Sequence, residues 1–260
     1  MDLSEDALLD GAVRLLQPKR GYRVTSDSVL LAALAPLYSE QRIIEFGTGY
    51  GQVALCLAAR QQECHITAFE LLPEVAELAQ RNVTLNQRQS QIEVCVGDVR
   101  GLTGLEADLV IANPPYRSLA THTVSSDVIK AAATAEQALG DVLAWAQAAR
   151  RLLKPLGTYL IIHDAARLPE IGEALQAAGF GAVQVLPLLA AAGEPPKRIV
   201  IRAVAGPVYS CVWLAGLVLH AAGGGRPPEI EVALRAPVGL DAVWQDQVAP
   251  SRQAAQAVRE

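Results

Sequence analysis

The sequence predicts an α/β fold in which a mainly parallel sheet carries helices on both faces. From Arg42 onward, short apolar segments typical of strands alternate with longer segments of helical spacing, as βαβ units require. Of the 260 residues, 51% are hydrophobic and only 5% are aromatic, so we expect a core of Ala, Leu, Val and Ile. The length suits one large layered domain with short extensions.

The first expected elements are a helix, a strand and a second helix. Val29–Leu34 is apolar and is followed by Pro36, which ends or bends a helix. Arg42–Phe46 is typical of a buried strand and runs into a glycine-rich turn at 47–51. Val53–Arg60 then has helical composition, so the turn joins a strand to a helix.

Later segments continue the alternation and then break it. Further strands are expected at His65–Glu70, Ile92–Val96, Ala107–Ala112, Tyr159–Ile162, Ala182–Leu189 and Arg198–Val204. Further helices are expected at Glu74–Asn86, Asp141–Lys154 and Leu168–Ala178. No helix separates the last two strands, which favours an antiparallel strand at the edge of the sheet.

We divide the chain into three parts. Residues 1–36 form a leader and a helix, and residues 37–205 form the α/β domain. Residues 206–260 are less periodic and contain Gly223–Gly225 and Pro227-Pro228. We expect this last part to be a loosely attached extension that is partly flexible, above all after Pro237.

Composition excludes several classes of protein. The formal net charge is −5, so any contact with nucleic acid must be local. The four cysteines show no spacing typical of a metal site and are expected to be small buried hydrophobes, so no metal is predicted. Met1–Asp10 is acidic, unlike a secretory signal, and the apolar run near 212–222 is too short to span a membrane. These observations predict a cytoplasmic protein without membrane contact.

The glycine-rich turn is the first candidate binding site. Gly47, Gly49 and Gly51 allow the backbone to approach a ligand and donate N–H groups, and Glu45 at the strand end can pair with a ligand ammonium. That combination suits an amino-acid moiety. A dinucleotide motif requires a third glycine where Gln52 stands, which disfavours a nicotinamide-dependent oxidoreductase.

Two acidic residues follow the next strands. Glu70 ends the second strand, where nucleoside-binding sheets place a carboxylate that binds ribose hydroxyls. Asp98 ends the third strand, where its carboxylate can accept a hydrogen bond from an adenine amino group. A nucleoside ligand is therefore predicted beside the glycine turn.

Asn113-Pro114-Pro115-Tyr116 follows the fourth strand and is the most informative motif. Its two prolines stiffen the loop. A planar amine is a poor nucleophile because its lone pair is delocalised. The Asn113 side-chain oxygen and the Pro114 carbonyl can accept its two N–H groups and favour a more tetrahedral nitrogen, while Tyr116 can stack on the substrate plane.

The motifs from Glu45 to Tyr116 resemble those of class I methyltransferases that act on exocyclic amines of adenine or cytosine, or on glutamine. Further segments are similar to the bacterial valine-tRNA adenine-N6 methyltransferase family, and the similarity covers about 21–234. These segments are 21–31, 152–155, 163–169, 197–202, 217–220 and 228–229.

The resemblance implies a Rossmann-like fold with a seven-stranded sheet whose last strand is antiparallel. It also implies S-adenosylmethionine as the cofactor and the anticodon-loop adenine of a tRNA as the substrate. The cofactor-binding residues that it implies are Glu45, Gly47, Gly49, Gly51, Glu70 and Asp98, with the segment around Asp27 closing over the methionine end. Asn113, Pro114 and Tyr116 would hold the target base.

One departure from the family concerns RNA. An arginine-rich stretch usually follows the N-P-P-Y loop in these proteins, whereas 130–136 is nearly uncharged here. The remaining basic candidates are Arg14, Lys19, Arg20, Arg23, Lys197, Arg198 and Arg202. The His163-Asp164 pair is interpreted as a positioning pair at the start of a loop and not as a catalytic dyad.

Three alternatives remain open. A protein-glutamine methyltransferase has the same chemistry, although such enzymes generally carry a larger helical domain at the amino end. DNA methylation is less expected because no separate target-recognition domain is evident. An inactive cofactor-binding adaptor is the non-enzymatic alternative, against which Asn113 argues. The oligomeric state is not predicted.

Overall fold

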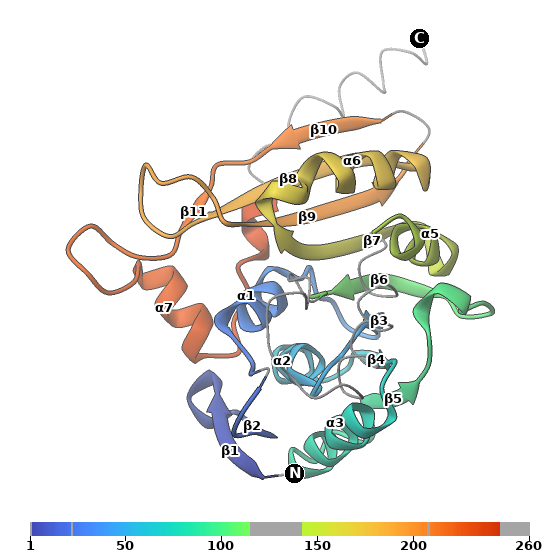
Figure 1. Ribbon diagram of the computed structural model, residues 1–260, viewed down its shortest axis with the longest axis vertical. Helices are drawn as coiled ribbons and strands as arrows, with labels where there is room; N and C mark the ends of the chain where they lie inside the picture. Colours follow the sequence, from blue (N-terminus) through green and yellow to red (C-terminus); the bar gives the residue numbers. More distant parts are fainter. Residues whose placement is uncertain (1, 22, 115–141, 207–208, 245–260) are drawn as a thin grey trace.

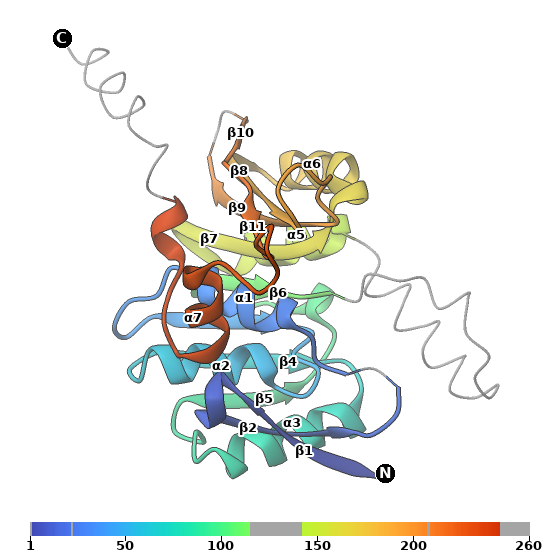
Figure 2. The ribbon, with the colours of Figure 1, turned by 90° about the vertical axis from the view of Figure 1, so that its left-hand side faces the viewer.

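A nine-stranded sheet forms the centre of the protein, with helices on both faces (Figures 1 and 2). The structure, a computed structural model, describes residues 2–21, 23–114, 142–206 and 209–244. The strands of the sheet are β3 (Arg42–Phe46), β4 (His65–Glu70), β5 (Ile92–Val96), β6 (Ala107–Ala112), β7 (Leu153–Asp164), β8 (Phe180–Leu189), β9 (Arg198–Ala205), β10 (Ser210–Trp213) and β11 (Leu217–Val218). The helices are α1 (Ser26–Leu34), α2 (Gln52–Arg60), α3 (Pro73–Leu85), α5 (Val142–Leu152), α6 (Leu168–Ala177) and α7 (Pro228–Arg235).

The strand order is β10-β8-β9-β7-β6-β3-β4-β5, with β11 also paired to β8. Strands β3 to β7 are mutually parallel, and β9 runs antiparallel between β7 and β8. The predicted α/β class is confirmed, and β3 to β9 are the seven strands that the resemblance implies. Strands β10 and β11 extend this sheet, so β8 and β10 lie between the antiparallel strand β9 and the edge of the sheet. The chain reverses its direction of winding at β3, whose neighbours are β4 and β6, and this switch point is where α/β sheets bind ligands.

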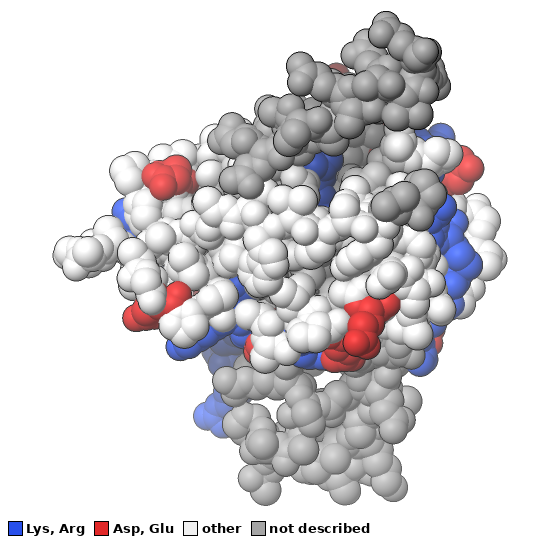
Figure 3. Space-filling view, turned by 90° about the horizontal axis from the view of Figure 1, so that it is seen from above, with Lys and Arg blue, Asp and Glu red and all other residues white. Residues whose placement is uncertain are grey.

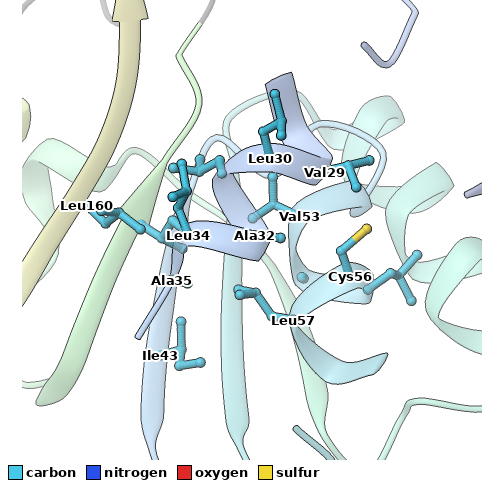
Figure 4. Close-up of a cluster of buried hydrophobic side chains, with 14 of the residues drawn as sticks. Val29, Leu30, Ala32, Leu34, Ala35, Ile43, Val53, Cys56, Leu57 and Leu160 are labelled. Carbon is cyan, nitrogen blue, oxygen red and sulfur yellow. The ribbon is translucent and has the colours of Figure 1, made fainter. Parts of the chain in front are cut away.

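Two apolar clusters hold the layers together. On one face, Val29 and Leu30 of α1 pack with Val53 and Leu57 of α2 over the sheet (Figure 4). On the other face, α5 and α6 cover the sheet around Trp145, whose ring meets the Phe46 ring edge to face. Each such buried side chain contributes roughly 1.5–3 kcal/mol by leaving water.

The cysteines only partly follow the prediction. Cys56 and Cys64 are buried as expected, whereas Cys95 is half-buried and Cys211 is exposed on the outer strand β10. All four are free thiols. Within the described ranges, no group of His, Cys, Asp and Glu side chains is suited to hold a metal ion. None of the helices described is long and apolar enough to cross a bilayer.

A hairpin of β1 (Leu3–Leu8) and β2 (Val13–Pro18), joined by the short η1 (Leu9–Gly11), precedes α1, where we expected only a leader. Two side-chain amides, from Asn82 in α3 and from Asn86 directly after it, hold its second strand. Asn82 accepts from the backbone N–H of Leu16 (2.7 Å) and donates to its carbonyl (2.9 Å), and Asn86 makes the same pair of bonds with Arg14. These side chains thus replace a neighbouring strand.

The segment after β9 is attached more firmly than we expected. Strand β10 pairs with β8, and α7 packs against α1. The carboxyl end of α1 is bonded to the η5 turn (Asp241–Trp244) and the residue before it, because Leu240 N–H donates to the Ala33 carbonyl (2.7 Å) and Trp244 Nε1 to the Leu34 carbonyl (2.7 Å). These bonds satisfy carbonyls that a helix end leaves without an internal partner.

Removing the indole N–H should therefore destabilise the protein. We expect Trp244→Phe to lower the free energy of unfolding by about 1–3 kcal/mol, because the Leu34 carbonyl stays buried without its donor. Trp213→Phe is the matched control, since Trp213 is 55% exposed and Trp244 only 2%. Urea unfolding of both variants measures the difference, and equal stability of the two would contradict this role of the indole.

Candidate cofactor and substrate site

Polar side chains gather where β3, β4, β5 and β6 end. These four strands are neighbours in the sheet and parallel, so their carboxyl ends lie along one edge. Direct contacts join the ends of the first three strands. Thr48 N–H donates to the Phe69 carbonyl (2.9 Å), and Gly97 N–H donates to the Glu70 carbonyl (2.9 Å). Asn113 joins them from β6, which pairs with β3 through Ala112 and Phe46.

The glycine turn follows β3 and leads into α2. Gly47, Gly49 and Gly51 have φ values of +66°, +59° and +84°, in the left-handed region that side chains disfavour. At Gly51, an added Cβ would meet Ala79 at an ordinary distance of 3.7 Å, so backbone conformation and not space requires glycine there. A hydrogen bond within the turn runs from Gly51 N–H to the Thr48 carbonyl (3.0 Å).

Glu45 braces this turn from beneath the surface. Its side chain is buried, and Oε2 accepts from the Thr48 hydroxyl (2.7 Å) and from the Ala54 N–H in the first turn of α2 (3.1 Å). Burial raises the pKa of Glu45 to about 8, and the nearby Glu70 carboxylate acts in the same direction. This carboxyl group therefore serves the geometry of the turn in the structure described.

Glu70 holds the turn from the neighbouring strand. Its Oε2 accepts from Gly49 N–H (2.9 Å) and its Oε1 from Leu72 N–H (3.1 Å). The side chain is largely buried, and burial raises its pKa against the opposing effect of these N–H donors. Two acidic side chains from adjacent strands thus fix the same glycine turn.

Asp98 is placed differently, at a more open strand end. Its carboxylate forms a two-pronged contact with Arg100, whose Nε lies 2.9 Å from Oδ1 and 3.0 Å from Oδ2. Hydrogen bonding from Arg100 lowers the pKa of Asp98, so the group is ionised at neutral pH. We did not predict a role for Arg100 from the sequence, although a basic residue two positions after a strand-end acid indicates such an ion pair.

Asn113 is held by the first helix. Its Nδ2 donates to the hydroxyl of Ser28 (2.9 Å), which lies fully buried in the first turn of α1. Pro114, the next residue, is buried. Tyr116, which we expected to stack on the substrate plane, lies outside the described residues. The contact joins residues 85 positions apart and brings α1 to the edge where the cofactor motifs meet.

A comparison of the whole sequence with known families identifies the family of the chain. The chain matches the model of the methyltransferase small domain over residues 23–167, which is more than half of its length. The chain belongs to this family. It is a methyltransferase, and its methyl donor is S-adenosylmethionine.

Individual relatives of this methyltransferase carry a more specific name. A protein of Aeromonas salmonicida described as tRNA1(Val) (adenine(37)-N6)-methyltransferase is 30% identical over 214 residues, which cover 78% of this chain and 84% of that protein. A protein of Bacteroides fragilis with the same description is 29% identical over 187 residues, covering 70% and 77%.

Solved structures confirm the fold. A predicted O-methyltransferase from Agrobacterium tumefaciens superposes with a TM-score of 0.68 at 24% identity, covering 82% of this chain and 97% of that one. A methyltransferase from Pyrococcus furiosus gives a TM-score of 0.57 at 18% identity, covering 75% and 90%. These likenesses establish the architecture alone.

The first turn of α1 is also tied to the ends of β7 and β9. Arg198 of β9 donates from Nε to Asp27 Oδ2 (3.2 Å) and from Nη1 to Asp164 Oδ2 at the end of β7 (3.2 Å). Asp27, which we expected near the methionine end of the cofactor, is therefore engaged by an arginine. Any contact between Asp27 and the cofactor competes with this ion pair.

His163 lies beside this cluster, fully buried at the end of β7. Its Nδ1 accepts from the Asp164 N–H (2.7 Å), and Arg167 Nη1 lies 3.3 Å from its Nε2. Burial, reinforced by Arg167, lowers the pKa of His163 to about 4, so the ring is neutral at physiological pH. A neutral ring that seldom takes up a proton fits the predicted positioning pair better than acid–base catalysis.

Most of the basic side chains considered for RNA are bound within the protein. Arg14 pairs with Glu5 (2.7 Å), Lys19 with Asp2 (3.0 Å) and Arg23 with Asp6 (2.9 Å). Arg202 was the wrong choice for a surface contact, because it lies in the sheet beside Gln184 and burial lowers its pKa. Arg20 and Lys197 are exposed. On the face seen in Figure 3, basic and acidic side chains are interspersed with much uncharged surface.

The buried carboxyl group of Glu45 gives stability a predictable pH dependence. The folded protein keeps a proton on Glu45 up to a pKa of about 8, whereas the unfolded chain releases it near 4.5. The stability that Glu45 contributes is therefore fully present below about pH 4.5 and is lost as the pH rises to about 8. We expect Glu45→Gln to flatten this fall, as measured by urea unfolding between about pH 5 and pH 8.

Glu77→Gln, at an exposed position on α3, is the matched control and should unfold with the pH dependence of the wild type. If Glu45→Gln also runs parallel to the wild type, Glu45 does not titrate in this range and the account of its burial is wrong.

Proposed function

We propose that this methyltransferase transfers the methyl group of S-adenosylmethionine to the exocyclic N6 of an adenine in the anticodon loop of a tRNA. The placement of Asn113 is the observation that carries the proposal. It puts an amide at the end of β6, next to the glycine turn, where Ser28 holds it by a hydrogen bond. The descriptions of the two relatives above name the same atom and the same class of RNA.

The strand ends have the donor and acceptor groups that the cofactor requires. Gly47, Gly49 and Gly51 leave a backbone without Cβ atoms at the end of β3. In this proposal Glu70 accepts from the ribose hydroxyls and the ionised Asp98 accepts from the adenine amino group of the cofactor. Bound here, S-adenosylmethionine supplies an electrophilic methyl group on a positively charged sulfur.

The methionine end of the cofactor would lie between the turn and α1. Its ammonium group would be attracted by Asp27 in α1, and its positive charge would favour release of the proton that the buried Glu45 carries below about pH 8. Because Glu45 accepts from Thr48 and Ala54, we infer that it acts chiefly by shaping the turn. Asp27 would help to close the site while it remains near Arg198.

The target nitrogen is a poor nucleophile because its lone pair is delocalised into the adenine ring. In this proposal the Asn113 Oδ1 and the Pro114 carbonyl accept its two N–H groups and draw the nitrogen toward a tetrahedral shape. Tyr116 stacks on the base. The chain thereby orients the nitrogen toward the methyl group. These hydrogen bonds stabilise the transition state more than the bound substrate.

The substrate must present its base outside a stack, which an anticodon loop does more readily than a duplex. We infer that Arg20 and Lys197 make local phosphate contacts, since the net charge of −5 gives no global attraction to RNA. DNA and membrane contacts are not part of the proposal, and a tRNA substrate places the enzyme in the cytoplasm.

Methyl transfer to defined acceptors tests the proposal. The purified protein is incubated with labelled S-adenosylmethionine and, separately, with unmodified total tRNA, unmodified release factor and DNA, and the labelled nucleosides or residues are then identified. We expect label in N6-methyladenosine from tRNA. Label in glutamine of the release factor or in DNA would replace the substrate, and cofactor binding without any transfer would favour an adaptor.

The role of Asn113 can be separated from cofactor binding. We expect Asn113→Ala to lower kcat by about 10²–10³-fold, because the lost acceptor acts on the transition state, while the Kd for S-adenosylmethionine stays within about twofold. Calorimetry and steady-state methylation measure the two quantities. Ser39→Ala, an exposed hydroxyl remote from the site, is the control and should change neither. An equal loss of affinity and rate would refute the assigned role.

A further inference from the structure

Ser28 occupies an unusual place for a helix serine. It lies in the first turn of α1, its side chain is fully buried, and its Oγ accepts from Nδ2 of Asn113 at 2.9 Å. Neither the sequence motifs nor the comparisons single out this residue. Its only side-chain partner in the described chain is thus the residue that we place at the target nitrogen.

The two ends of the Asn113 amide are chemically opposite, because Oδ1 only accepts hydrogen bonds and the Nδ2 group only donates them. An adenine amino group that presents N–H groups needs an acceptor. A rotation by half a turn about the last side-chain bond would put a donor against a donor. Such a rotation is sterically easy for an amide, so packing alone does not choose between the two orientations.

In the structure, Nδ2 is directed at the Ser28 hydroxyl, and Oδ1 lies on the other side of the amide carbon. Because a hydroxyl can accept from Nδ2 or donate to Oδ1, the contact with Ser28 fixes where the amide lies. We propose that Ser28 is a positioning residue that anchors the Asn113 amide at the end of β6, beside the substrate nitrogen. This inference rests on the proposed function, since it names what anchors the acceptor in that same site.

The rest of α1 keeps Ser28 in place. One residue earlier, Asp27 is bound by Arg198, which also holds Asp164 at the end of β7. At the other end of the helix, Arg60 donates to the Ala32 and Ala35 carbonyls. A helix fixed at both ends presents the hydroxyl at one position, as anchoring an amide requires.

A purely structural role would look different in a double-mutant cycle. If Ser28 acts through Asn113, removing it matters only while the amide is present. If Ser28 merely stabilises α1, removing it harms the enzyme by the same factor whether or not Asn113 is intact. The two readings therefore predict different rates for the double variant.

The experiment compares the wild type, Ser28→Ala, Asn113→Ala and the double variant, using the acceptor that the wild type methylates. We expect Ser28→Ala to lower kcat about three- to tenfold, the worth of one neutral hydrogen bond, with the Kd for S-adenosylmethionine within about twofold. In the Asn113→Ala background, the same change should alter kcat by less than about twofold. Ser39→Ala is again the control.

A loss from Ser28→Ala that is as large in the Asn113→Ala background as in the wild type would overturn the inference. So would an unchanged kcat of the single variant. Should Ser28→Ala fail to fold, Ser28→Cys replaces it with the same expectations, because sulfur fills the site but accepts hydrogen bonds weakly. Failure of the wild type to methylate any acceptor would instead count against the proposed function, because that assay does not depend on a change at Ser28.

Discussion

The anchoring of α1 at both ends is the constraint on which the site depends. A helix of nine residues is too short to persist in water by itself, so its position must come from tertiary contacts. At its carboxyl end, the backbone of Leu240, the indole of Trp244 and the guanidinium of Arg60 bind carbonyls that would otherwise lack partners. At its amino end, Ser28 reaches Asn113. A segment more than 200 residues from α1 in the sequence thus helps to place the helix that contacts Asn113.

The glycine turn depends on a second, electrostatic constraint. Glu45 and Glu70 come from adjacent strands and both are largely buried, and the Glu70 carboxylate adds to the burial that raises the pKa of Glu45. Each carboxyl group accepts hydrogen bonds from the turn. With a pKa of about 8, Glu45 is uncharged at neutral pH, so two buried negative charges are avoided. A cofactor that brings a sulfonium and an ammonium group would favour the ionised form of Glu45.

Local sequence patterns predicted the sheet and the strand-end residues but not the contacts that organise them. The alternation of apolar segments identified β3 to β9, and the positions of Glu70, Asp98 and Asn113 after strands placed them at one edge. The β1–β2 hairpin was missed because its outer partner is Asn82 of α3, a side chain 66 residues from Leu16. Ser28 was missed for the same reason, since a long-range hydrogen bond leaves no periodic signal.

The charge distribution limits how the proposed RNA substrate would be recognised. Arg14, Lys19 and Arg23 are each paired with a carboxylate near the amino-terminal hairpin, so they add little to the outward field. In the proposed function, recognition would rest on a few exposed groups such as Arg20 and Lys197. Encounter with RNA would then be slower than for a basic protein, and selection would shift to the acceptors at the target nitrogen. The amide of Asn113, held by Ser28, is the group best placed to make that selection.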